Sequence, residues 1–160
     1  KKDNRSYYYY MHRNLYDKIN VKKENINLFN GEAKNPNKEC KSYENKLNNH
    51  KINLQILGVG VNGHVGYNEP GSSFNSRTRL IDLSEKTIMS KFKEKKKHPV
   101  QALTIGIKNI MSAKKLLLLA SGKEKKEAVR HLVQGKISSE WPVSFLRKHK
   151  NLTVIVDFGV

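Results

Sequence analysis

A glycine-rich stretch holds the residues whose types and spacing best suit acid–base chemistry. It reads GVGVNGHVGYNEP at residues 58–70 and contains Asn62, His64 and Glu69. A histidine beside a carboxylate can hold one tautomer and transfer protons near neutral pH, which general acid–base catalysis requires. The stretch therefore predicts a catalytic loop. The alternative interpretation is a histidine with a purely structural role in a tight turn.

The same stretch also contains the pattern G-x-G-x-x-G at Gly58, Gly60 and Gly63, with Asp82 about twenty residues further on. Taken alone, this pattern predicts a dinucleotide-binding turn. The glycine and proline that follow, up to Pro70, disfavour the helix that such a turn requires. We therefore expect no dinucleotide cofactor, and we expect the glycines to allow close approach of the backbone to another ligand.

Basic residues occur at two further places that suit an anion. Residues 121–125, SGKEK, form a predicted strand-to-helix turn with exposed amides and lysines, as phosphate sites often have. The alternative is an ordinary capped helix with surface lysines. Residues 76–79, SRTR, bring two of the six arginines close to the glycine-rich stretch, where they form either an anion site or surface ion pairs.

Strands that alternate with helices predict an α/β fold with a mainly parallel sheet. The expected strands cover residues 26–29, 52–60, 79–83, 101–107, 116–120 and 152–157. The expected helices cover residues 6–19, 37–47, 84–92, 121–133 and 141–147. The strand at 116–120 is fully apolar, which predicts burial on both faces. Ligands of such sheets bind beyond the carboxyl ends of the strands, where we expect residues 58–69, 106–108 and 121–125.

Composition narrows the class of protein. The 160 residues suffice for one domain, and their 31 basic against 14 acidic residues give a net charge of +17. Such an excess suggests a nucleic-acid partner, but only six of the basic residues are arginines, whose forked side chains read bases, and we expect none. The single cysteine excludes an internal disulfide, and the histidines show no metal-ligand spacing. Because the apolar runs are too short to cross a bilayer, we expect no membrane partner. The single cysteine favours a reducing compartment, so we expect a cytoplasmic location.

Residues 57–79 closely resemble the active-site loop of glucosamine-6-phosphate deaminases, also called isomerases. The resemblance continues through residues 100–107, 110–111, 117–122 with Lys125, 141–142 and 153–157, and so spans nearly the whole chain. The string G-H-x-x-x-N-E-P at residues 63–70 separates this family from the 6-phosphogluconolactonases, which share only the Gly-His turn.

This resemblance implies a Rossmann-like three-layer α/β/α fold and a hydrolytic deamination. Glucosamine 6-phosphate and water would give fructose 6-phosphate and ammonia, in amino-sugar catabolism, with no cofactor and no metal. His64 would open the sugar ring, supported by Glu69 and Asn62, within a substrate loop that includes Gly60 and Gly63.

The resemblance also implies roles for three basic residues. Lys125 matches a lysine that holds the substrate phosphate. Lys91 stands where the family has an arginine that also contacts this phosphate. Lysine keeps the charge there but loses the bidentate fork. Arg79 falls where some hexameric members bind an allosteric anion, so a homo-oligomer is one expectation.

One departure from the family concerns the start of the fold. Members have a further segment before anything similar to Ser6 and Tyr7, and that segment supplies a phosphate loop and the aspartate that moves a proton between two sugar carbons. We therefore expect residues 1–160 to form a single α/β domain, the carboxyl-terminal two thirds of the family fold. The alternatives are a catalytically incomplete fragment that binds sugar phosphates or polyanions, and a relative of the 6-phosphogluconolactonases.

Overall fold

The computed structural model describes residues 3–4, 6–91 and 100–159, without the side chains of residues 86, 90 and 91. Its contacts gather in two compact units, residues 1–30 and residues 31–160. Whether the two units make the single domain expected from the sequence stays a prediction. No helix among the described residues is long and apolar enough to cross a membrane.

The first unit is helical. Helix α1 (Tyr7–Asn14) begins as predicted at Ser6, whose hydroxyl accepts a hydrogen bond from the Tyr9 amide at 3.1 Å. The helix ends before the predicted residue 19, and two single-turn helices, η1 (Tyr16–Lys18) and η2 (Lys23–Asn25), follow it. The strand predicted at residues 26–29 is wrong: this segment has no regular secondary structure. A strand that short is stable only within a sheet.

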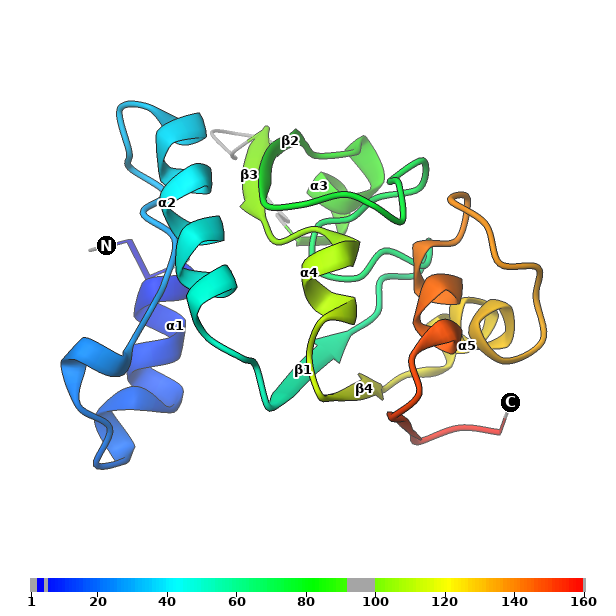
Figure 1. The fold of residues 1–160 in the computed structure, drawn as a ribbon. Helices are drawn as coiled ribbons and strands as arrows, with labels where there is room; N and C mark the ends of the chain where they lie inside the picture. The colour runs from blue at the N-terminus through cyan, green and yellow to red at the C-terminus, as the bar shows by residue number, and fades with distance from the viewer. Residues whose placement is uncertain (1–2, 5, 92–99, 160) are drawn as a thin grey trace. The chain divides into compact units, whose positions relative to one another are not determined.

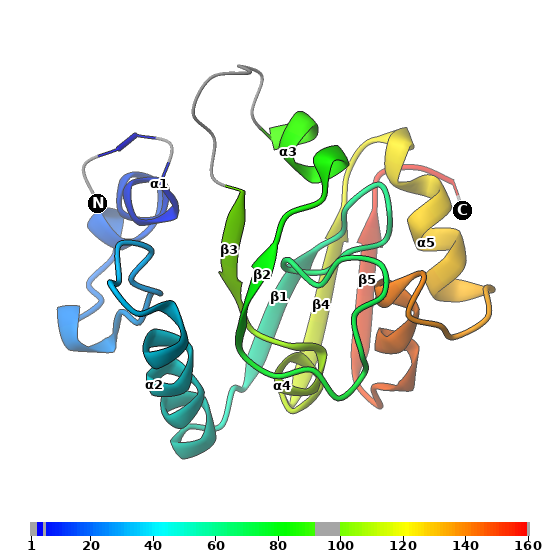
Figure 2. The same cartoon turned by 90° about the horizontal axis from the view of Figure 1, so that it is seen from above.

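The second unit contains the parallel sheet. Strands β1 (Leu54–Gly58), β4 (Lys115–Ala120) and β5 (Leu152–Val156) lie side by side in the order β1-β4-β5, all parallel (Figure 2). This confirms the α/β class with a parallel sheet. Since the carboxyl ends of parallel strands lie at the same end of the sheet, the segments that follow β1 and β4 leave the sheet next to each other.

Strands β2 (Arg79–Asp82) and β3 (Gln101–Thr104) form a separate antiparallel pair. The expectation that residues 106–108 leave the carboxyl edge of the parallel sheet is therefore wrong. The strand predicted at 101–107 stops at Thr104, because helix α4 (Ile107–Met111) begins directly after Gly106.

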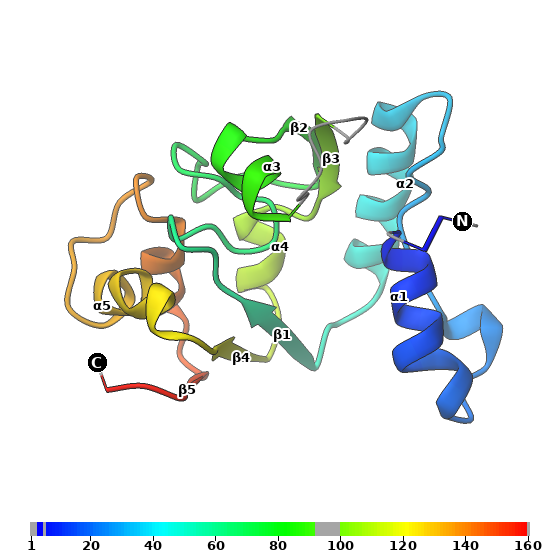
Figure 3. The same ribbon diagram turned by 180° about the vertical axis from the view of Figure 1, so that it is seen from behind.

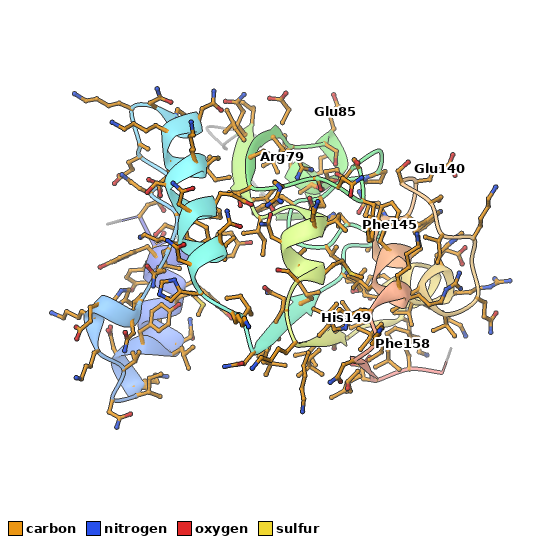
Figure 4. The ribbon with its side chains drawn as sticks, in the orientation of Figure 1. Arg79, Glu85, Glu140, Phe145, His149 and Phe158 are labelled. Carbon is orange, nitrogen blue, oxygen red and sulfur yellow. The ribbon has the colours of Figure 1, made fainter. Side chains whose placement is uncertain are left out.

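Helices cover one face of the parallel sheet. Figures 1 and 3 show the sheet nearly edge-on, with α4 and α5 (Lys126–Val133) on the same side of it. The segment η4 (Pro142–Lys148) also packs there, and Figure 4 labels Phe145 in it. The helix predicted at 121–133 starts with a turn, η3 (Lys123–Lys125), and no side chain caps that turn. The largest fully buried core residues are Val65, Ile107, Ile110, Leu116, Leu118, Val129, Leu132, Val143 and Leu146.

The prediction that residues 116–120 are buried on both faces is wrong. Leu116 and Leu118 have at most 1% of their surface exposed, whereas Leu119 is 44% exposed. Successive side chains of a strand point to opposite faces, so Leu119 lies on the face that the helices leave open.

Helix α2 (Pro36–Asn49) carries a carboxylate that joins three segments. The carboxylate of Glu44 accepts hydrogen bonds from Arg77 Nη1 at 2.6 Å, the Thr78 amide at 3.1 Å and Asn109 Nδ2 at 2.9 Å. Burial opposes ionisation of Glu44, but the hydrogen bonds from Thr78, Asn109 and Arg77 outweigh it and lower its pKa to about 2. Glu44 thus fastens α2 to the segment before β2 and to α4.

Replacing Glu44 with glutamine should lower the thermal midpoint at pH 7 by about 3 to 10 °C, since an anchored carboxylate is worth roughly 1–3 kcal/mol. Because the folded-state pKa lies near 2 and the ordinary value is 4.5, this stabilisation is complete above pH 4.5 and disappears as the pH falls toward 2. The difference in thermal midpoint between the unmodified protein and Glu44→Gln should therefore shrink below pH 4.5. Thermal circular dichroism at pH 7 and pH 3 measures it, with Glu140→Gln, an exposed position labelled in Figure 4, as the control. Equal midpoints for Glu44→Gln and Glu140→Gln at pH 7 would contradict the anchoring role.

Candidate active site

The chain turns back on itself directly after β1. The Gly63 amide donates to the Gly60 carbonyl at 2.9 Å, and the Gly60 amide donates to the His64 carbonyl at 2.9 Å. Gly63 has φ +80°, a conformation that side-chain-bearing residues rarely adopt, and its α-carbon faces the ring of Trp141. These bonds bring the His64 imidazole over the backbone of Gly60.

Asn62, His64 and Glu69 converge within this turn. Asn62 Nδ2 donates to Glu69 Oε2 at 2.8 Å, and Asn62 Oδ1 accepts from the His64 amide at 3.3 Å. His64 Nδ1 lies 3.6 Å from Glu69 Oε2, and only 13% and 14% of the two side chains are exposed. The structure therefore brings together the three residues that the sequence singled out, while their roles stay predictions.

The carboxylate of Glu69 is held in its ionised form. Burial alone would raise its pKa, but the contacts of His64, Thr87 and Asn62 outweigh burial and lower the pKa to about 2. His64 Nδ1 is buried, without a hydrogen-bond partner among the described residues, and faces this negative charge. A proton on Nδ1 is favoured there, which leaves Nε2 as the proton acceptor. The pair can thus act as a general base with a fixed tautomer.

Sequence reasoning missed a fourth member of this cluster, Thr87 in helix α3 (Glu85–Lys91). Thr87 is 2% exposed and donates its hydroxyl hydrogen to Glu69 Oε1. Ser84 Oγ in turn donates to Thr87 Oγ1 at 3.1 Å and accepts from the Thr87 amide at 3.2 Å. Both oxygens of Glu69 are thereby hydrogen-bonded, which fixes the orientation of the carboxylate. The Ser84 to Thr87 spacing is a helix-cap signal and gives no hint of a partner 18 positions earlier.

Arg79 binds the loop itself. Its Nη1 donates to Asn68 Oδ1 at 2.9 Å and its Nη2 donates to Ser72 Oγ at 3.1 Å. Asn68 is fully buried and donates to the carbonyls of Val65 and Ile105, both at 2.9 Å. Figure 4 labels Arg79. The guanidinium therefore stabilises the segment that carries Glu69, and the allosteric anion role expected for it stays a prediction.

Lys125 lies at the end of η3, which follows the carboxyl end of β4. The adjacent parallel strand β1 ends on the same side of the sheet. We expected exposed amides in the turn before Lys125. The Gly122 amide there instead donates to Asp157 Oδ1 at 2.9 Å. The Ser121 hydroxyl donates to Asp157 Oδ2 at 2.5 Å, and the first residue before η3 is Gly122 with no side-chain cap, so the cap predicted for Ser121 is wrong. The side chain of Lys91, the other expected phosphate contact, lies outside the described residues.

A sequence profile described as glucosamine-6-phosphate isomerases/6-phosphogluconolactonase matches residues 1–155. The chain belongs to this family. Within the glucosamine-6-phosphate isomerase/6-phosphogluconolactonase family, a glucosamine-6-phosphate deaminase of Clostridium botulinum is 49% identical over 156 residues. That match covers 95% of this chain and 64% of the relative.

Two solved structures of the glucosamine-6-phosphate isomerase/6-phosphogluconolactonase family define the fold further. A monomeric glucosamine-6-phosphate deaminase superposes with a TM-score of 0.94 at 41% identity, over 97% of this chain and 66% of its own. A 6-phosphogluconolactonase of Thermotoga maritima gives a TM-score of 0.75 at 20% identity, which supports the fold alone. The chain thus spans about two thirds of its relatives, and the monomeric relative lends no support to the expected homo-oligomer.

Proposed function

We propose that the whole protein converts glucosamine 6-phosphate to fructose 6-phosphate and ammonia, by aldose–ketose isomerisation coupled to hydrolytic deamination. The observation that carries the proposal is the His64–Glu69 pair, fixed by Asn62, in a chain 49% identical to a deaminase. The more distant 6-phosphogluconolactonases, about 20% identical, support only the fold.

The geometry supports a first step in which the sugar ring opens. With its proton held on Nδ1 toward Glu69, His64 can take a proton from the C1 hydroxyl at Nε2 and return it to the ring oxygen. The negative charge of Glu69 stabilises the imidazolium that exists between these two transfers. Lys125, at the same edge of the sheet, supplies a positive charge for the phosphate group.

The later steps require more than the described residues. Proton movement between C2 and C1 needs a base, which the family resemblance assigns to a segment that has no counterpart in residues 1–160. We therefore propose that deamination requires this chain together with that segment, and that residues 1–160 by themselves bind the sugar phosphate without turnover.

A chimera tests the proposal. The matched two thirds of the Clostridium botulinum relative are replaced by residues 1–160, and ammonia and fructose 6-phosphate are measured after addition of glucosamine 6-phosphate. We expect equal amounts of both products, and for residues 1–160 alone a rise in the thermal midpoint with substrate but no ammonia. A folded chimera that releases no ammonia, or that hydrolyses 6-phosphogluconolactone instead, would contradict the proposal.

Gly60 should be essential for the position of His64. A Cβ at Gly60 would lie 2.3–2.6 Å from the atoms of the imidazole ring, so the ring must move in Gly60→Ala. Because displacement by about 1 Å costs on the order of a hundredfold in rate, kcat of the chimera should fall about tenfold to a hundredfold.

Gly31→Ala is the control for Gly60→Ala, because a Cβ at Gly31 has no atom within 4 Å in the described structure and Gly31 lies outside the loop at residues 58–70. Steady-state kinetics and far-ultraviolet circular dichroism compare the two variants. Equal kcat values with intact folds would show that the ring position does not matter.

A further inference from the structure

The turn that carries His64 rests against one aromatic ring. A Cβ at Gly63 would lie 2.6 Å from Trp141 Cε3, so the indole is already in contact with the Gly63 α-carbon. The Val143 amide donates to the Gly63 carbonyl at 2.8 Å. Because glycine has no side chain of its own, these two outside contacts set the direction of the peptide bond that leads into His64.

The indole of Trp141 is held in turn by a histidine of helix α5. The rings of Trp141 and His131 are stacked, with centroids 3.9 Å apart and planes inclined by 8°. His131 Nε2 lies 3.2 Å from Glu127 Oε1, one helical turn earlier. On the other side of the ring, a Cβ at Gly135 would lie 2.8 Å from His131 Nδ1, so this backbone also borders the imidazole closely. Three contacts therefore fix the ring that supports Trp141.

Helix α5 is a rigid base for this support. Its residues Val129 and Leu132 are at most 2% exposed and belong to the main core. Arg147 of η4 donates to the carbonyls of Val133 and Gly135, at 3.1 and 2.7 Å, and so fastens the end of α5 to the segment η4 beside it (Figure 2). A displacement of the indole therefore has to break the ring stack, because α5 cannot follow it.

The His131 side chain lies at the surface and not in the core. It is 28% exposed. It also borders a surface pocket of about 360 Å³, whose other lining residues are Glu127, Arg130, Gln134 and Gly135. A substitution at such a position costs little stability. The stack with Trp141 can therefore be removed while the fold is kept.

We propose that His131 is a positioning residue for His64, acting through Trp141 and Gly63. The stack keeps the indole against the Gly63 α-carbon, and the Gly63 peptide then directs the His64 imidazole toward Glu69. Because rates fall steeply when a reacting group is displaced by fractions of an ångström, a surface ring can affect the reaction in this way. The effect on rate rests on the proposed function, whereas the position of His64 can be measured without any turnover.

Nuclear magnetic resonance of the chimera measures the environment of His64 directly. The Cε1–Hε1 signal of His64 is identified by its absence from the spectrum of His64→Ala. It should shift in His131→Gln, which keeps a polar group near Glu127 but has no ring. It should stay near its original position in His131→Phe, which keeps the stack, and in Val133→Ala, a control on α5 where the native side chain is 51% exposed. An unchanged His64 signal in folded His131→Gln would overturn the proposal.

Steady-state kinetics with the same variants provides the second measurement. His131→Gln should lower kcat for glucosamine 6-phosphate about threefold to tenfold, because His64 is displaced but the bond from Val143 to Gly63 remains. KM should stay within about twofold, since no group that binds the substrate is removed. His131→Phe should retain at least about half of the original kcat, and Val133→Ala should match the unmodified chimera.

The competing interpretation is that the stack only packs α5 against the segment that follows it. His131→Gln would then lower the thermal midpoint but leave the His64 signal and kcat unchanged, and the proposal would be wrong. Equal losses of kcat in His131→Phe and His131→Gln would also overturn it, because the ring stack would not be the cause. A chimera that releases no ammonia in any form would contradict the proposed function, while the His64 signal would still decide the role of His131.

Discussion

Replacing His64 with alanine is expected to reduce ammonia release by the chimera at least about a hundredfold, the usual contribution of one general acid–base group. The variant loses the group that faces Glu69 at 3.6 Å, and no other histidine shares that environment among the described residues. His64 Nδ1 has no hydrogen-bond partner among the described residues, so alanine leaves no such partner unpaired and the fold should persist. Steady-state kinetics with glucosamine 6-phosphate measures the effect.

His12→Ala is the control for His64→Ala. His12 lies in the first unit, where its Nδ1 is 2.9 Å from Asp17 Oδ1, and it has no part in the proposed site. We expect kcat of His12→Ala to stay within about twofold of the unmodified chimera, as for most surface substitutions. If His64→Ala retained near-normal kcat, His64 would have no role in the reaction.

Replacing Glu69 with glutamine is expected to lower kcat about tenfold to a hundredfold, because the imidazolium formed during ring opening loses its negative neighbour. The pKa of Glu69 is about 2, so the carboxylate is ionised throughout the working range of the assay. The variant should therefore lower kcat over the whole working pH range of the assay.

A kcat deficit of Glu69→Gln that vanishes at the acid end of the pH range would show instead that the carboxyl of Glu69 is already protonated there. Glu140→Gln, at an exposed position, is the control for the general effect of removing one negative charge. A kcat for Glu69→Gln equal to that of Glu140→Gln would remove Glu69 from the mechanism.

Local sequence was enough to find the loop and three of the side chains that meet in it. Asn62, His64 and Glu69 lie within eight positions of one another, and the glycines between them permit only a few tight backbone paths. The hydrogen bond from Asn62 to Glu69 is therefore a consequence of the segment itself. The strands of the parallel sheet were also predictable, because their apolar runs have few other stable places.

Contacts between distant segments could not be predicted in the same way. Thr87 and Glu44 are ordinary helix residues in the sequence, yet one fixes Glu69 and the other holds the segment before β2. Likewise, the Gly122 amide looks free to bind phosphate until the fold brings Asp157 to it. Each of these contacts depends on how elements pack, which no local pattern encodes.

The sequence by itself determined the α/β class and the loop that carries Asn62, His64 and Glu69, because apolar patterning and short-range backbone geometry set them, and its resemblance to known proteins indicated the family. Only the tertiary structure decided which face of the sheet is covered. The run at residues 116–120 is apolar at every position, so its pattern predicts two buried faces, but burial requires a layer of helices on each side. Residues 31–160 place that layer on one side, and Leu119 and Ile155 remain exposed on the other.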